Sequence, residues 1–403
     1  MRITGIYLPK YSVAISFVFV SMFAVSISGY SVPVQSDFLR EIDIKLIETD
    51  TADKGYLDSL LLKKAAAEIS QGKYGEVHAM LIYKDSKMLF EEYFPGHQYK
   101  WDGPNHHGDL IKWDKSIPHG VKSVSKSITS LCIGIAIDKG FIKSVDQSVF
   151  DYLPDHQSLR RDGKEKITIE HLLTMTSGLE WGEWNTPLSS EKNDIVGIWF
   201  QDKDPVSFIL EKPLIKEPGT VFNYSGGNTI LLGEIIRQAT KMDLEMFAKQ
   251  YLFKPLGIDS VIWGLRYKNG VIEAGGGLEI RPRDLVKIGA LCLNKGKFKG
   301  RQIVSEKWIE KCSTPYANNT HIFIPGHFSG SHGYAYSWWL KSYKKAGKEF
   351  NMFHAVGWGG QDLIILPELN MVVVFTGGNY VPLTTTFSIL DKYILTAVSV
   401  SKE

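Results

Sequence analysis

Cysteine is scarce in this chain, and its cysteines show no pairing pattern. The 403 residues include three of them, Cys132, Cys292 and Cys312. Three are too few for a disulfide scaffold, and none has a second cysteine or a histidine at the spacing of a zinc site. Cys132 and Cys292 lie in apolar runs, so we expect small, buried core residues there.

An excess of one charge is also lacking. Lys and Arg number 46 and Asp and Glu number 44, which leaves a formal net charge of +2. No segment forms a polycationic stripe, so a nucleic-acid partner is not expected. The sequence contains no HExxH, EF-hand loop, GxxxxGK[ST] or GxSxG, and its 11 histidines are scattered. These absences argue against a metal site, a phosphate loop and an α/β-hydrolase nucleophile.

Long apolar runs are lacking except at the beginning of the chain. Residues 11–28 are mostly apolar and uncharged, Arg2 and Lys10 precede them, and small residues follow. This pattern predicts a secretory signal peptide within residues 1–30. The run over residues 11–28 is also long enough to be an uncleaved membrane anchor, which would hold the protein to the inner membrane. Either alternative predicts an exported protein, periplasmic or secreted.

The remaining chain shows no internal repeat and changes its pattern twice. We expect a helix over 57–69, a β-hairpin over 78–94, a helix over 123–139, a helix over 283–293, strands over 332–340, 363–367 and 371–377, and a closing helix over 387–398. Strands, then helices, then strands again indicate an α+β fold. The predicted regions are an N-terminal extension with a helix (31–74), a sheet region (75–145 with 265–403), and a mainly helical region (146–264). The helical region is expected to be inserted between the two halves of one antiparallel sheet flanked by helices.

The sequence S-x-x-K occurs five times, but only Ser123–Lys126 opens an apolar helix. A serine three residues before a lysine shares its face of a helix, so the two side chains can meet. A buried lysine can serve as the base that a serine nucleophile needs. The alternative is that Ser123 only caps the helix.

A second candidate residue is Tyr224, which follows a Pro-Gly turn and precedes small residues and another apolar helix. A phenol on such a tight loop can face a cleft, where it can relay protons beside a lysine. The alternative is a tyrosine that packs at the entry of the helix.

Several segments together resemble the serine β-lactamase-like hydrolases, which include class C β-lactamases, DD-peptidases, family VIII esterases and 6-aminohexanoate-dimer hydrolase. The segments that carry the resemblance are Ser123-Val-Ser-Lys126, Ile167 to Leu179, Tyr224-Ser225-Gly226, Gly275 to Leu285, and Gly357-Trp-Gly-Gly-Gln361. They cover most of the chain from Val77 onward and occur in the family's order. The resemblance implies a β-lactamase/transpeptidase-like fold.

The resemblance also implies catalytic roles. Ser123 would be the acylated nucleophile, Lys126 would help to deprotonate it, and Tyr224 would act as partner base and then as proton donor to the leaving group. The backbone N–H groups of Ser123 and Trp358 would form the oxyanion hole. No metal and no organic cofactor is implied.

Two departures from the family pattern narrow the range of expected substrates. Ala355-Val356-Gly357 stands where β-lactamases and DD-peptidases carry a basic residue, and Gly226 replaces the Asn of Tyr-x-Asn. The missing cation and amide argue against β-lactams and favour the esterase and amidase branch. Gly226, Gly357 and Trp181 are the expected substrate contacts.

Three tryptophans in the middle of the chain have two interpretations, which stay open. They either line an apolar acyl pocket or pack the helical region. They are Trp181, Trp184 and Trp199.

The predicted function is an exported serine hydrolase that acts on a small-molecule amide or ester through an acyl-serine intermediate. Two alternatives stay open: a β-lactamase or D-amino-acid peptidase, and a non-catalytic cell-wall or peptide-binding relative on the same fold. The sequence makes no prediction of the oligomeric state.

Overall fold

A computed structural model describes residues 57–188, 190–317, 319–327, 329–345, 347–381 and 386–398. The predicted signal or anchor (1–30) and the first part of the predicted extension lie outside these residues. Among the helices of the described part, none is long and apolar enough to cross a membrane. Export therefore stays a prediction.

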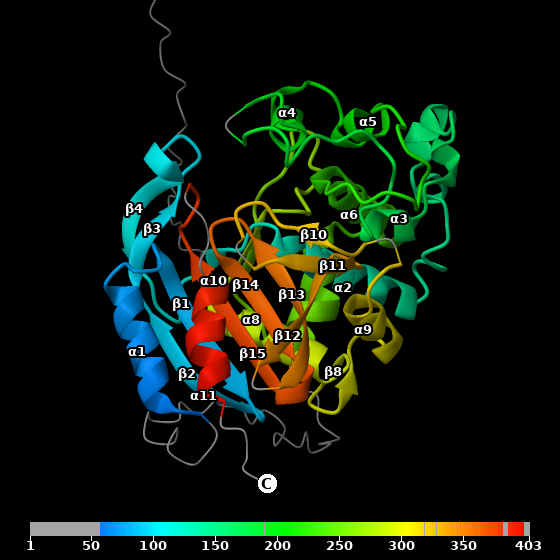
Figure 1. Ribbon diagram of the computed structural model, residues 1–403. Helices are drawn as coiled ribbons and strands as arrows, with labels where there is room; N and C mark the ends of the chain where they lie inside the picture. The colour runs from blue at the N-terminus through cyan, green and yellow to red at the C-terminus, as the bar shows by residue number, and fades with distance from the viewer. Residues whose placement is uncertain are drawn as a thin grey trace, which may run out of the picture. The chain divides into compact units, whose positions relative to one another are not determined.

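An eight-stranded antiparallel sheet is the largest element of the structure (Figure 1). Its order is β10 (Ile322–Phe323), β11 (Ser331–Ala335), β12 (Trp338–Lys345), β13 (Lys348–Gly357), β14 (Gln361–Leu366), β15 (Met371–Gly377), β1 (Val77–Lys84) and β2 (Lys87–Tyr93). The first strand, β1, pairs with the last strand, β15, and β2 pairs with β1, so the sheet is assembled from both ends of the sequence. The predicted α+β organisation is confirmed.

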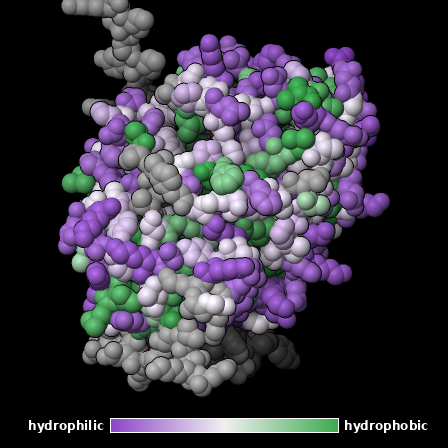
Figure 2. Space-filling view, in the orientation of Figure 1, coloured by the Kyte–Doolittle hydropathy of each residue, from purple (hydrophilic) through white to green (hydrophobic). Residues whose placement is uncertain are grey.

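Helices cover both faces of the sheet, and each face has its own apolar core. On one face, α1 (Ser59–Ser70) packs with the C-terminal helices α10 (Thr386–Ile389) and α11 (Leu395–Ala397), which Figure 1 shows in front of the strands. On the other face, α8 (Pro282–Leu293) contacts β14, β15 and β1. The surface in Figure 2 is mostly hydrophilic with scattered hydrophobic side chains, because most of the apolar side chains are buried.

The helix α2 (Val124–Asp138) joins the sheet to the helical region. Its side chains are buried from Val124 to Ala136, as the apolar sequence predicts. It contacts β13 on one side and α6 (Gly226–Thr240) on the other. The other helices of the middle region are α3 (Ile169–Leu173), α4 (Asp194–Gly197), α5 (Pro205–Leu210) and α7 (Leu244–Ala248). The predicted region 146–264 is thus mainly helical, although its boundaries as a domain stay a prediction.

Short strands complete the structure. They are the hairpin β3 (Pro95–Tyr99) and β4 (His107–Lys112), the small sheet β5 (His119–Gly120), β7 (Leu278–Ile280) and β6 (Val261–Trp263), and the pair β8 (Lys297–Phe298) and β9 (Arg301–Gln302). The helix α9 (Glu306–Ser313) packs near β11, β12 and β13.

One predicted strand is wrong. The segment 332–340 is divided between β11 and β12 by a tight turn at Tyr336 and Ser337, whose φ angles are 44° and 67°. Residues other than glycine rarely adopt positive φ, so an aromatic residue gives no signal for such a turn.

Candidate active site

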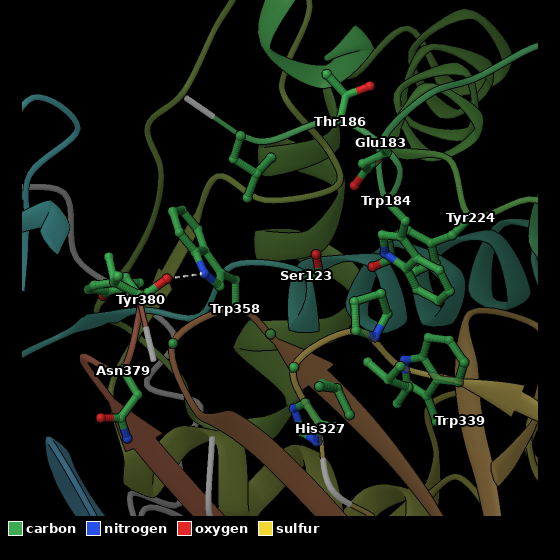
Figure 3. Close-up of a pocket in the computed structure, with 18 residues that line it drawn as sticks. Ser123, Glu183, Trp184, Thr186, Tyr224, His327, Trp339, Trp358, Asn379 and Tyr380 are labelled. Carbon is green, nitrogen blue, oxygen red and sulfur yellow. Dashed lines mark hydrogen bonds between the residues drawn. The ribbon is translucent and has the colours of Figure 1, made fainter. Parts of the chain in front are cut away.

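Ser123 lies where the loop after β5 enters α2, at the N-cap position of the helix. The preceding residue, Lys122, has a φ of 49°, a left-handed conformation that is unusual for a side chain of this size. This sharp bend directs the chain from the small sheet into the buried helix. Figure 3 shows the Ser123 hydroxyl at the floor of a pocket, between Trp358 on one side and Tyr224 on the other.

Lys126 follows Ser123 by one turn of α2 and is buried. Its Nζ donates hydrogen bonds to Ser123 Oγ at 3.0 Å and to the carbonyl oxygen of Gly275 at 3.0 Å. A Cβ atom at Gly275 would lie 3.2 Å from this Nζ, so the absence of a side chain there leaves room for the lysine. The structure thus brings together the serine and the lysine, as the S-x-x-K spacing predicts.

Tyr224 approaches the same pair from the loop that precedes α6. Lys126 Nζ lies 5.0 Å from the centroid of its ring. Burial raises the pKa of Tyr224 well above its ordinary value, the carboxylate of Glu183 raises it further, and a hydrogen bond with Ser123 opposes both effects. The resting side chain is therefore a neutral phenol, which is a proton donor.

The wall opposite Tyr224 comes from the end of β13. A Cβ atom at Gly357 would lie 2.3 Å from the carbonyl oxygen of Val121, so only glycine lets this strand approach the start of α2. Trp358 follows, and its indole Nε1 donates to the carbonyl oxygen of Tyr380 at 2.8 Å, the dashed line in Figure 3. The predicted oxyanion donors, the N–H groups of Ser123 and Trp358, belong to residues that both line the pocket.

The pocket has a volume of about 350 Å³. Its described lining residues are Ser123, Glu183, Trp184, Thr186, Leu188, Tyr224, Ile324, Pro325, Gly326, His327, Trp339, Val356, Gly357, Trp358, Gly359, Asn379, Tyr380 and Val381. Among them, Glu183 is the only acidic residue, and there is no lysine or arginine. Trp184 stacks on Tyr224 with ring centroids 4.7 Å apart, which makes one side of the pocket aromatic.

The three expected substrate contacts lie in different places. Gly357 lines the pocket, whereas Gly226 and Trp181 do not. The backbone N–H of Gly226 and the indole N–H of Trp181 donate to Glu183 Oε2 at 2.6 and 2.9 Å. Both residues therefore orient the Glu183 carboxylate without lining the pocket themselves. Of the other tryptophans, Trp184 lines the pocket. Trp199 stacks on Tyr267, with ring centroids 4.2 Å apart.

The place of the missing cation is closed to solvent. The Ala355 side chain is completely buried in the large core cluster, and its neighbour Val356 faces the pocket. His354, one residue earlier, is also fully buried. Neither residue replaces the cation that the relatives carry there.

Sequence reasoning missed several residues of the site. Glu183 and Trp339 line the pocket, and the buried Glu273 is placed near Lys126, whose charge lowers the pKa of this carboxyl while burial raises it more. An acidic residue between two tryptophans, Trp181 and Trp184, was the signal available for Glu183. Trp339 gave no signal, because it comes from a strand distant in the sequence.

The chain matches a family of known proteins over most of its length. The model of the family described as Beta-lactamase matches residues 76–379. The chain is 27% identical over 265 residues to the 6-aminohexanoate-dimer hydrolase of Paenarthrobacter ureafaciens, an alignment that covers 64% of this chain and 65% of that protein. The chain spans less than two thirds of the length of such curated relatives; it covers 39% of the acyltransferase mokF of Monascus pilosus.

Solved structures show the same fold. The octameric penicillin-binding protein homologue from Pyrococcus abyssi has a TM-score of 0.61 at 21% identity, covering 85% of this chain and 78% of that one. A family VIII carboxylesterase also has a TM-score of 0.61, at 15% identity, covering 83% of this chain and 96% of that one. The predicted β-lactamase/transpeptidase-like fold is confirmed.

Proposed function

The chain belongs to the beta-lactamase family, which has hydrolase members. From this premise we propose that the protein is an exported serine hydrolase. It would cleave an amide or ester bond through an acyl-serine intermediate. The observation that carries the proposal is the 3.0 Å contact between Lys126 Nζ and Ser123 Oγ at the floor of the pocket. A serine hydroxyl is a weak nucleophile unless a base lies within hydrogen-bonding distance.

Acylation begins with attack of Ser123 Oγ on the substrate carbonyl carbon, while Lys126 Nζ takes the hydroxyl proton. The carbonyl oxygen becomes an oxyanion, which the N–H groups of Ser123 and Trp358 stabilise; each such donor is worth about 3–4 kcal/mol in the transition state. Tyr224 then gives its phenolic proton to the leaving amine or alcohol. The proton on Lys126 passes to the resulting phenolate, so that both groups return to their resting states.

Deacylation repeats these steps with water as the nucleophile. Water attacks the acyl carbon, the bond between this carbon and Ser123 Oγ breaks, and Oγ recovers a proton through Lys126 and Tyr224. The products are a carboxylic acid and a free serine. Ser123, Lys126 and Tyr224 carry the proton transfers of both half-reactions, and water is the second substrate.

The charge of the pocket supports the amidase and esterase branch. No lysine or arginine is among the described lining residues, so a carboxylate beside the scissile bond would find no cation to pair with. Glu183 supplies the opposite charge, and within the described part of the chain no hydrogen bond engages its second carboxylate oxygen, Oε1. We therefore propose substrates with a neutral or cationic acyl group, such as linear amino-acid amides.

The test is the intact mass of the protein after reaction with a fluorophosphonate, with the Ser123→Ala variant beside it. We expect one adduct on the native chain, located at Ser123, and none on the variant, whose thermal midpoint should stay the same. A panel of esters and amides with neutral, cationic and carboxylate acyl groups then measures the preference.

Absence of an adduct on the folded native chain, together with absence of turnover on the panel, would favour a non-catalytic peptide-binding relative. Preferred turnover of the carboxylate substrates would contradict the charge argument while leaving the serine mechanism intact.

A further inference from the structure

A cluster of imidazoles and a carboxylate lies outside the catalytic pocket. We propose that Glu76, His97 and His107 form a binding site for a divalent transition-metal ion, with zinc as the ion of best fit. Glu76 immediately precedes β1, His97 lies on β3 and His107 begins β4. One ligand atom from each residue lies within 4.8 Å of those of the other two. The three are dispersed in the sequence, which is why a search for fixed zinc spacings does not find them.

The hydrogen bond of His107 determines which of its ring nitrogens is available. Nε2 lies 2.8 Å from the carbonyl oxygen of Gly378. A carbonyl only accepts, so Nε2 carries the hydrogen and Nδ1 of the neutral ring carries a lone pair. Metal-bound histidines commonly donate their other N–H to a backbone carbonyl in this way.

The Nδ1 atom of His107 lies near another electron-rich atom. Nδ1 lies 3.8 Å from Glu76 Oε1, a carboxylate oxygen. Two such atoms repel each other unless a cation lies between them. A bound metal ion would remove this repulsion, and binding measurements test for it.

Glu76 is oriented to present Oε1. Its other oxygen, Oε2, accepts a hydrogen bond from the backbone N–H of His97 at 2.8 Å and lies 3.3 Å from Nε2 of the buried His78. Its own backbone N–H donates to Asn379 Oδ1 at 2.8 Å. The two contacts of Oε2 orient the carboxylate, as the outer contacts of metal ligands do, and the bond to Asn379 holds the backbone of Glu76.

The separations from Glu76 suit zinc after small movements, and a rotation of one imidazole would also be needed, because the His97 and His107 rings stack with centroids 4.8 Å apart. A tetrahedral zinc ion with bonds of about 2.0–2.1 Å holds its ligands roughly 3.3 Å apart. Glu76 Oε1 lies 2.6 Å from His97 Nδ1 and 3.8 Å from His107 Nδ1, so one separation opens and the other closes, each by less than about 1 Å. The His97 side chain is 37% exposed, which lets solvent exchange its ring proton and occupy the fourth position.

A metal here would connect the β3–β4 hairpin to the wall of the pocket. Gly378 and Asn379, which bond His107 and Glu76, follow β15 directly. Asn379 lines the pocket and its backbone N–H donates to the carbonyl oxygen of Gly359 at 3.0 Å, also in the pocket wall. An ion bound to the folded state alone would stabilise this segment.

The experiment uses the full chain, stripped of metal with a chelator and dialysed. Equilibrium dialysis with Zn²⁺ should give one ion per chain, Co²⁺ should give the visible absorption of a tetrahedral site, and Zn²⁺ should raise the thermal midpoint. His97→Ala, His107→Ala and the nearly isosteric Glu76→Gln should each weaken binding by about tenfold or more. His106→Ala, which changes the adjacent histidine outside the cluster, should bind as the native chain does.

Two results would overturn the site. The first is no Zn²⁺ binding by the native chain, which would mean that the three side chains form a hydrogen-bonded cluster only. The second is binding that His97→Ala and His107→Ala leave unchanged although circular dichroism shows both variants folded, which would place the ion elsewhere.

Discussion

At the scale of single residues, the phenol of Tyr224 separates a catalytic role from a packing role. The Tyr224→Phe variant keeps the ring that stacks on Trp184 and removes only the hydroxyl. Because loss of a general acid typically costs 10² to 10⁴ in rate, we expect kcat to fall by about that factor with little change in KM. Steady-state kinetics on the best ester or amide of the panel measures both constants.

The control for this variant is Tyr152→Phe, which removes a hydroxyl that bonds Gln147 outside the pocket. Its kcat should equal that of the native chain. If Tyr224→Phe also keeps the native kcat, Tyr224 only packs, and the proton for the leaving group must come from Lys126 or from water.

The residues that were predictable are those whose chemistry depends on local spacing. Ser123 and Lys126 lie one helical turn apart, so the sequence alone brings their side chains together. Glu183 and Trp339 enter the pocket from an irregular loop and from β12, and no period or motif in the sequence relates them. The same reason hides Glu76, His97 and His107, which meet only when β1, β3 and β4 are assembled.

At the scale of elements, the close packing of α2 against α9 depends on Gly134. A Cβ atom there would lie 2.5 Å from the indole of Trp308, which is nearly fully buried. Overpacking a core costs about 1–3 kcal/mol, whereas alanine gains at most about 1 kcal/mol of helix propensity over glycine. We therefore expect Gly134→Ala to lower the free energy of unfolding, as urea denaturation will measure.

A change at Trp308 tests whether its indole causes the loss of stability. In a Trp308→Leu background the obstacle is smaller, so Gly134→Ala should cost less than it does in the native chain. An equal cost in both backgrounds would show that the indole does not limit the approach of α2 and α9. Gly120→Ala, where an added Cβ has no atom within 4 Å, is the control for a glycine replacement without overpacking.

Elements were predictable where one periodicity holds over several turns or residues. The hairpin of β1 and β2 turns at Asp85 and Ser86, as its polar turn residues predict. The turn at Tyr336 and Ser337 was missed because its residues continue the alternation of the flanking strands. Tertiary contact decides there: Ser337 donates its backbone N–H to the carbonyl oxygen of Leu173, in the helical region.

At the scale of the whole molecule, one carboxylate adds a charged contact between the two ends of the described chain, which a β-bridge from Leu57 to Val398 also joins. Glu68 on α1 accepts a hydrogen bond from the Tyr393 hydroxyl at 2.5 Å, and Lys392 and Lys73 lie 3.3 Å from its carboxylate oxygens. The bond from Tyr393, together with these lysines, lowers the pKa of Glu68 from 4.5 to about 2 although burial opposes the shift. The ionised form is therefore the one that stabilises the contact.

The direction of the resulting pH dependence follows from this shift. The pKa of Glu68 is lower in the folded state than in the unfolded state, so its contribution to stability is complete above pH 4.5 and is lost as the pH falls toward about 2. We expect Glu68→Gln to lower the free energy of unfolding at pH 6, and the difference from the native chain to shrink steadily between pH 4.5 and 2. Urea denaturation across this range measures it.

The exposed Glu310→Gln on α9 is the matched control, and its difference from the native chain should stay small at each pH. A Glu68→Gln difference that is constant from pH 6 to 2 would mean that shape and hydrogen bonding, rather than charge, join α1 to the closing helix. Loss of the contact at low pH would instead free α1 first, because α1 packs with the C-terminal helices as the outer layer of the sheet. The core on the other face, which holds α2 and the candidate nucleophile, should then remain protected in hydrogen exchange at a pH where α1 already exchanges.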